Sequence, residues 1–301
     1  LAELAEQFSV VRDTFAEASA ALGFDLWQIA QSGEGLDQTE NTQPVLLTAS
    51  IALWRVWLEL GGIAPKYLAG HSLGEYSALV AAEAMTLADA VKLVHLRGKL
   101  MQSAVPQGTG AMAAILGLAD EKVIELCQKV NASAAGQGSV EAANYNAQGQ
   151  VVIAGSTALV QQVMAEAKEQ SGKAIALPVS VPSHCTLMKP AAEKFAEALE
   201  QTAIELPRIP VIQNVNAEIA TDVAQLRQAL TAQLYQSVQW TRSMQYLQDQ
   251  GIQYVVECGP GTVLSNLAKR LPNIEKAFAI DSKARMEDAL SAILVAEGKI
   301  A

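Results

Sequence analysis

The stretch that most strongly indicates the fold of this chain is Tyr-Leu-Ala-Gly-His-Ser-Leu-Gly, residues 67–74. It is followed directly by alanine-rich sequence. The short apolar start predicts a strand, and the sequence after Gly74 predicts a helix. Between them Gly70–Gly74 has the form G-x-S-x-G, the pattern of a nucleophile elbow. In such a turn the serine backbone is strained, and the flanking glycines let neighbouring chain approach. The pattern predicts Ser72 as a nucleophile; the alternative is a glycine-rich turn without chemistry.

A serine hydroxyl needs a general base, and the chain contains three histidines. His71 adjoins the serine, so its side chain would project away from Ser72 Oγ. His95 lies within a predicted helix and has an equally good structural explanation. His184 follows a strand end and a proline-directed loop at 179–182, where catalytic side chains are often carried. His184 is therefore the predicted base.

The group that orients the imidazole is left open by the sequence. Asp89 and Asp120 lie between Ser72 and His184, but both stand at predicted helix starts, where capping explains them. A dyad oriented by a backbone carbonyl is at least as good an interpretation. For the oxyanion, the turn predicts the Leu73 N–H and the positive end of the following helix as the stabilising groups.

The composition limits the class of protein. Of the 301 residues, 50% are hydrophobic and 17% are charged, which predicts a large core and no disorder. The net charge of −10, with no block of basic residues, argues against nucleic acid or an anionic membrane surface as the main partner. No apolar run is long enough to span a membrane. The few, widely spaced cysteines show no metal-ligand spacing and favour a reducing compartment, so we expect a cytoplasmic enzyme.

A change in sequence texture predicts an inserted subdomain at 108–180. Strands are predicted at 111–118, 140–144, 150–154 and 173–179, with helices at 120–130 and 157–170. The order β-α-β-β-α-β is the ferredoxin-like arrangement. We therefore expect an inserted ferredoxin-like α+β subdomain within a core formed by residues 1–107 and 181–301.

The core itself is predicted to alternate helices with short apolar strands. An amphipathic helix is expected over Leu1–Phe15, a helix opened by Pro44 through 45–60, and another at 87–104. Strand candidates lie at 209–214, 254–258 and 277–280. This pattern predicts an α/β, hydrolase-like core with a mostly parallel sheet covered on both faces.

At 70–80 the sequence GHSLGEYSALV closely resembles the malonyl-CoA:acyl-carrier-protein transacylases. Further matching segments run in order along nearly the whole chain: TQPVLLTAS at 42–50, RGKLMQ at 97–102, GTGAMAAI at 108–115, GQVVIAGS at 149–156, PVSVPSHCTLMKPAA at 178–192, QLYQSVQWTRS at 233–243 and ECGPGTVLSNL at 257–267. The resemblance implies the same two-part fold and a transfer of malonyl groups between thioesters.

The resemblance also assigns roles to individual residues. It implies Ser72 as nucleophile, His184 as base, Arg97 as ligand of the malonyl carboxylate, Gln43 in the same pocket, Gln233 as the carbonyl that holds the histidine, and Asn144 and Asn146 near the pocket mouth. The role of Arg97 is physically reasonable because a guanidinium fork binds a carboxylate bidentately. The alternative for Arg97 is a solvated helix arginine.

As partners, the resemblance implies malonyl-CoA and an acidic acyl carrier protein, with no metal or redox cofactor and a monomeric enzyme. Lys189, Lys269 and Arg270 are candidates for receiving the carrier protein. Family members begin with a strand and a G-Q-G-S-Q loop, whereas this chain begins at Leu1, so we expect the numbered chain to omit a short N-terminal segment. A serine thioesterase or esterase with the same dyad, and a carrier-binding subunit without activity, remain alternatives.

Overall fold

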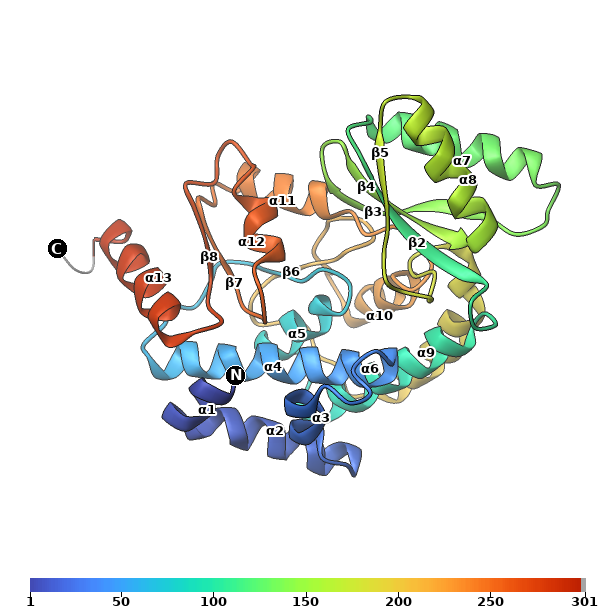
Figure 1. The fold of residues 1–301 in the computed structure, drawn as a ribbon. Coiled ribbons are helices and arrows are strands. Elements are labelled where there is room, and N and C mark those ends of the chain that lie inside the picture. The colour runs from blue at the N-terminus through green and yellow to red at the C-terminus, as the bar shows by residue number, and fades with distance from the viewer. Residues whose placement is uncertain (299–301) are drawn as a thin grey trace. The chain divides into compact units, whose positions relative to one another are not determined.

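The computed structural model describes residues 1–298, which form two compact units (Figure 1). Unit 1 contains Leu1–His95, Ala203–Val211 and the chain from Met244 onward. Unit 2 contains Leu96–Thr202 and Ile212–Ser243. Two helices, α6 (Leu87–Ser103) and α11 (Trp240–Asp249), run from one unit into the other.

The N-terminal part of unit 1 is helical, but it is not the single helix that the sequence predicted. The helices are α1 (Ala2–Gln7), α2 (Ser9–Leu22), α3 (Leu26–Ser32) and α4 (Thr39–Glu59). Phe8 separates the first two because its backbone is extended, with φ −130° and ψ 109°, and no α-helix contains that conformation. The apolar periodicity nevertheless continues, since Val11 and Phe15 are buried where α2 packs along α4.

Helix α4 begins at Thr39, so the prediction that Pro44 opens it was wrong. Proline in a helix interior has no N–H for the carbonyl four residues earlier, which here belongs to Glu40. His95 Nδ1 lies 2.8 Å from the Glu40 carbonyl oxygen and supplies the missing donor. The side chain of His95 is therefore explained by structure.

The strands of unit 1 are short. β7 (Tyr254–Glu257) and β8 (Lys276–Ala279) form a parallel pair at two of the predicted positions. β1 (Leu68–Ala69) pairs with β6 (Val211–Ile212), and the Leu68 N–H donates to the Pro210 carbonyl at 2.9 Å. The strand predicted at 209–214 is thus reduced to two residues, because Pro210 offers no N–H and the chain turns after Gln213.

A four-stranded antiparallel sheet lies within unit 2. Its elements are β2 (Gly110–Leu116), α7 (Asp120–Ser133), β3 (Val140–Ala147), β4 (Gln150–Ser156), α8 (Thr157–Glu169) and β5 (Lys173–Ala176). The predicted order β-α-β-β-α-β is confirmed, with strands side by side in the order β3-β4-β2-β5. The two helices cover one face of the sheet (Figure 1). β5 ends three residues earlier than predicted, because Pro178 cannot extend the ladder.

Further helices lie in unit 2. A 3₁₀ turn, η1 (Thr186–Met188), leads into α9 (Lys189–Gln201), which packs against α10 (Val223–Ala232). Unit 1 further contains α5 (Gly74–Ala81), α12 (Val263–Ala268) and α13 (Lys283–Ala296). Within residues 1–298 no helix is both long and apolar enough to cross a membrane.

Candidate active site

In unit 1 the G-x-S-x-G pattern forms the predicted strand-turn-helix. β1 ends at Ala69, the turn holds Ser72, and α5 starts at Gly74. The Ser72 backbone has φ +52°, a left-handed conformation that costs a residue with a Cβ about 1–3 kcal/mol. Strain of this kind persists only where the surrounding structure enforces it.

The two glycines of the turn are not equivalent. A Cβ on Gly70 would lie 1.9 Å from the Gly74 carbonyl carbon and 2.4 Å from the Glu75 nitrogen, so residue 70 must be glycine. Apart from its chain neighbours and the backbone of its own helix, a Cβ on Gly74 would meet no described atom within 4 Å. The expectation that both glycines admit neighbouring chain therefore holds for Gly70 and was wrong for Gly74.

Leu73 precedes α5 and takes the N-cap position of that helix. The next two N–H groups are used within the turn, from Gly74 to the His71 carbonyl at 2.9 Å and from Glu75 to the Ser72 carbonyl at 3.1 Å. The positive end of α5 therefore starts directly beside the serine. Gln43, also in unit 1, lies on α4 with 5% of its surface exposed.

In unit 2 His184 is buried and held by two main-chain carbonyls. Its own N–H donates to the Leu234 carbonyl at 3.0 Å, and Nδ1 lies 2.7 Å from the Gln233 carbonyl oxygen. Because a carbonyl oxygen only accepts, Nδ1 must carry the hydrogen in this bond. The neutral ring then presents Nε2 as an acceptor, which is the state a general base requires.

Gln233 also binds Arg97 through its side chain. Arg97 Nη2 donates to Gln233 Oε1 at 3.0 Å, and Gln233 Nε2 donates to Asn214 Oδ1 at 3.3 Å. All three side chains are at most 1% exposed. A guanidinium buried this deeply is not the solvated helix arginine of the alternative reading. The structure brings Arg97, Gln233 and His184 into one hydrogen-bonded group.

Asn144 and Asn146 lie two residues apart on β3, where the pairing with β4 shifts register between Tyr145 and Ala147. Asn144 is buried and forms a parallel bridge with Val238. The bridge is fixed by the Tyr145 N–H to the Val238 carbonyl and by the Val238 N–H to the Ala143 carbonyl, both at 2.9 Å. β3 is thereby joined to the segment that follows Gln233.

The two aspartates considered as orienting acids differ from each other. Asp89 is bound to Thr86 at the start of α6: the Asp89 N–H donates to Thr86 Oγ1 at 3.1 Å, and Thr86 Oγ1 donates to Asp89 Oδ2 at 2.8 Å. Asp120 is the first residue of α7, whose N-cap is Ala119 without a side-chain cap. The capping explanation was therefore wrong for Asp120. Burial, together with the nearby Glu121 carboxylate, raises the pKa of Asp120.

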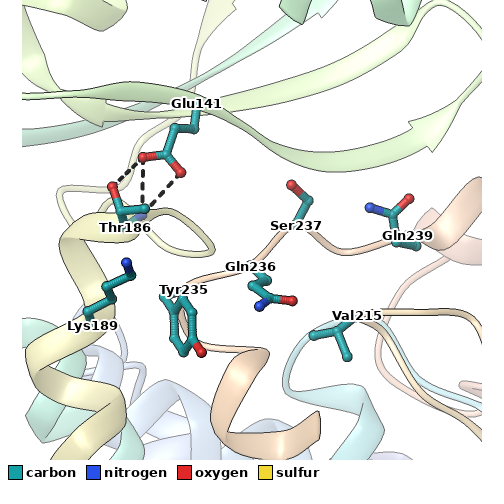
Figure 2. A pocket seen from close by; sticks show the side chains of 8 residues that line it. All are labelled: Glu141, Thr186, Lys189, Val215, Tyr235, Gln236, Ser237 and Gln239. Carbon is teal, nitrogen blue, oxygen red and sulfur yellow. Dashed lines mark hydrogen bonds between the residues drawn. The ribbon is translucent and has the colours of Figure 1, made fainter. Parts of the chain in front are cut away.

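An open cavity of about 420 Å³ lies in unit 2 beside the His184 loop (Figure 2). It is lined by Glu141, Thr186, Lys189, Val215, Tyr235, Gln236, Ser237 and Gln239. Thr186 follows His184 by two residues, and Tyr235 follows Gln233 by two. The lining is mostly polar and includes one cation and one carboxylate.

Sequence reasoning missed Asn214, Glu141 and Thr186. Nothing in their local sequence marks them, because each acts through a partner far along the chain: Gln233 for Asn214, and Glu141 and Thr186 for each other. Of the predicted residues, Gln43, Ser72 and Leu73 belong to unit 1, and Arg97, Asn144, Asn146, His184 and Gln233 belong to unit 2. Over residues 1–298 no group of three His, Cys, Asp or Glu could hold a metal ion.

Comparison with known proteins decides the family. The model of the acyl transferase domain matches residues 2–284. The chain belongs to the acyl transferase domain family. Within that family it is 51% identical over 294 residues to the malonyl CoA-acyl carrier protein transacylase of Salmonella typhimurium, covering 97% of this chain and 94% of the relative. The resemblance seen in the sequence is confirmed.

Solved structures of family members agree. The crystal structure of FabD from Acinetobacter baumannii is 88% identical, with a TM-score of 0.96 over 98% of this chain and 94% of that one. A second neighbour is a malonyl-transacylase, 47% identical with a TM-score of 0.93, solved in complex with a type II polyketide synthase acyl-carrier protein. It covers 97% of this chain and 94% of its own. This acyl transferase is thus similar to family members over nearly their whole length.

Proposed function

We propose that this acyl transferase moves a malonyl group from malonyl-CoA to the phosphopantetheine thiol of an acyl carrier protein, through a malonyl ester of Ser72. The observation that carries the proposal is Gln233, which accepts from Arg97 with its side chain and from His184 with its main chain. One residue thereby links a buried cation suited to a carboxylate with a histidine in the state of a general base. The relatives named as malonyl transacylases support the same activity.

In the first half-reaction the malonyl carboxylate binds Arg97, and His184 Nε2 takes the Ser72 proton as Oγ attacks the thioester carbonyl. The Leu73 N–H and the positive end of α5 stabilise the tetrahedral oxyanion. The carbon–sulfur bond then breaks, and the imidazolium protonates the departing CoA sulfur. Ser72 retains the malonyl group as an ester.

The second half-reaction reverses the roles. His184 takes the proton of the carrier phosphopantetheine thiol, whose sulfur attacks the ester carbonyl. Ser72 Oγ leaves with that proton, and the malonyl thioester of the carrier is released. A thiol positioned at the ester competes with water by its effective concentration, so exclusion of water favours transfer over hydrolysis.

Selectivity for malonyl follows from the burial of Arg97. A guanidinium exposed by only 1% gains a bidentate partner from the malonyl carboxylate, whereas an acetyl group leaves the cation without that partner. Gln43, Asn144 and Asn146 are proposed to line the same acyl pocket and its mouth.

We further propose that residues 1–107 and 181–301, of which 299–301 lie outside the described residues, form a hydrolase-like core with the ferredoxin-like subdomain inserted at 108–180. The parallel pair β7–β8 and the strand order β3-β4-β2-β5 support this arrangement. We also propose a monomeric enzyme in a reducing cytoplasmic environment; the three free thiols support the reducing environment.

Intact-mass spectrometry after mixing with malonyl-CoA tests the proposal. The parent should gain one malonyl group, and Ser72→Ala should gain none. Arg97→Ala should lose malonyl loading and accept acetyl from acetyl-CoA, while the exposed Arg242→Ala serves as the matched arginine control and should load as the parent does. Absence of an adduct on the parent, or an adduct on Ser72→Ala, contradicts the mechanism.

A second measurement separates transfer from hydrolysis. Purified malonyl-enzyme is followed with and without holo acyl carrier protein. Transfer predicts an adduct that is stable alone and is discharged rapidly by the carrier thiol. Rapid loss of the adduct in buffer, unchanged by the carrier, identifies a thioesterase.

A further inference from the structure

The backbone of His184 has a conformation that is uncommon for residues other than glycine. Its φ is +62°, in the left-handed region. Contacts with neighbouring residues stabilise this conformation, and the bonds to the Gln233 and Leu234 carbonyls are two of them. Any further group that fixes the loop also sets the direction of the imidazole.

Strand β3 is connected to the segment that supplies those two carbonyls. Besides the backbone bonds between Val238 and residues 143 and 145, Ser237 Oγ donates to the Ala142 carbonyl at 2.6 Å. Thr241 Oγ1 donates to the Tyr145 carbonyl at 3.0 Å. These bonds hold residues 237–241 against β3. Because Leu234 lies just before this segment in the chain, β3 also restrains its position.

The same strand is also hydrogen-bonded, through Glu141, to the loop that follows His184. The Thr186 N–H donates to both oxygens of the Glu141 carboxylate, at 3.3 and 3.2 Å, and the Thr186 hydroxyl donates to Oε1 (Figure 2). Thr186 starts η1, so the carboxylate faces the positive end of the turn that leads into α9. Charge-assisted bonds of this kind are stronger than neutral ones.

We propose that Glu141 is a positioning residue for the reaction: from β3, it holds the loop that follows His184 and thereby sets the direction of the imidazole. The inference rests on the proposed role of His184 as the base. Glu141 touches neither substrate nor reacting atoms in this scheme. It acts through Thr186 and the strained peptide of His184.

The test compares Glu141→Ala, Glu141→Gln and Thr186→Ala by rapid-quench malonyl loading of Ser72, followed by intact mass. Misplacing a catalytic group by a fraction of an ångström lowers the rate of the chemical step more than substrate affinity. We expect Glu141→Ala to load about tenfold more slowly, with the KM for malonyl-CoA within about twofold of the parent. Glu141→Gln keeps an acceptor oxygen and should recover the rate to within about threefold of the parent. Thr186→Ala keeps the N–H bonds and should fall between the two.

The exposed Glu169→Ala on α8 of the same unit is the matched control for removing a carboxylate and should load at the parent rate. Rates are expressed per folded molecule, with folding checked by circular dichroism, so that a loss of folded protein does not imitate a slower step. A Glu141→Ala rate within about twofold of the parent overturns the inference. So does an equal fall in Glu141→Gln, or a change confined to KM.

His184→Ala is measured in parallel. If it loads as fast as the parent, the base itself has been wrongly assigned and the proposed function fails. If it is inactive while Glu141→Ala is unaffected, the base stands and only the positioning role of Glu141 is lost.

Discussion

The main-chain oxygen of Gln233 lies 2.7 Å from His184 Nδ1, and this bond fixes which imidazole nitrogen carries the hydrogen. The Gln233 side chain accepts from Arg97 at 3.0 Å, so the residue bonded to His184 also binds Arg97. Substituting Gln233 leaves its main-chain oxygen in place, and the two functions can therefore be separated by mutation.

We expect Gln233→Leu to lower the free energy of unfolding by about 1.5–3 kcal/mol, because a buried guanidinium and the buried Asn214 amide each lose a partner. The KM for malonyl-CoA should rise as Arg97 loses its orientation. Urea denaturation and steady-state kinetics measure both effects. Gln228→Leu, at an exposed position on α10, is the control and should change stability by no more than about 0.5 kcal/mol. Equal stabilities for the two variants would contradict the prediction.

Gly70→Ala should destabilise the protein by about 3 kcal/mol or more, since the new Cβ would stand 1.9 Å from main-chain atoms that cannot move aside cheaply. Gly74→Ala is its matched partner. Apart from its chain neighbours and its own helix backbone it meets no described atom, and it lies at a helix start, so stability should stay within about 0.5 kcal/mol of the parent or rise. Thermal melts of the two variants measure this difference in stability. Similar losses at both positions would show that the turn does not have the backbone packing described here.

His95 and Pro44 should be energetically coupled through the Glu40 carbonyl. His95→Ala removes the donor and should cost about 1 kcal/mol of stability, with malonyl loading retained. In a Pro44→Ala background residue 44 regains an N–H for that carbonyl, so the same His95→Ala change should cost less. A double-mutant cycle should give a coupling of about 0.5–1 kcal/mol. The ring contact of His95 with Phe24 is lost in both backgrounds and cancels. A coupling of zero would argue against the Glu40 bond.

The buried thiols predict a loss of stability at alkaline pH. Burial raises the pKa of Cys127 and of Cys185 to about 12, from the usual 9.0, and the Glu141 carboxylate adds to the rise. The unfolded chain therefore releases these protons first, so stability is fully present below pH 9 and falls as the pH rises from 9 toward about 12. At pH 10 the raised pKa of each thiol should lower the free energy of unfolding by about 1.4 kcal/mol relative to its value below pH 9.

Urea denaturation at pH 8, 9 and 10 checks this dependence against the double variant Cys127→Ala/Cys185→Ala. Other groups that titrate above pH 9 are common to both proteins, so the difference in slope isolates the thiols. Parallel slopes for parent and variant would refute the prediction.

Lys189 should assist the encounter with the acidic carrier protein. It is exposed at the cavity beside the His184 loop, with Nζ 5.8 Å from the centre of the Tyr235 ring. Starting from purified malonyl-enzyme, Lys189→Glu should slow discharge by subsaturating carrier about fivefold at low salt, with a smaller effect at high salt. Lys168→Glu, an exposed charge reversal on α8, is the control. If both variants discharge alike, the carrier docks elsewhere, and Lys269 and Arg270 become the next positions to reverse.

Local patterns in the sequence were sufficient for several parts of this protein. The nucleophile turn was predictable because its constraints lie within five residues, and Ser72 has the left-handed backbone that the pattern implies. The β-α-β-β-α-β order was predictable because each element carries its own periodicity and its own turn residues. The prediction that Pro44 opens its helix was wrong because the missing N–H of Pro44 is compensated by His95, 51 positions away along the chain.

The amino-acid sequence by itself therefore determined the family, the strand-turn-helix around Ser72 and the order of the elements in the antiparallel sheet, and it predicted His184, among the three histidines, as the base. Only the tertiary structure decided which groups surround that histidine. The bond from His184 to the Gln233 carbonyl joins residues 49 positions apart, and the bond from Arg97 to the Gln233 side chain joins residues 136 positions apart. The bond from Thr186 to Glu141 joins residues 45 positions apart. Such contacts depend on how distant segments pack, and a main-chain carbonyl is present in every residue, so no residue type in the sequence marks the one that is used.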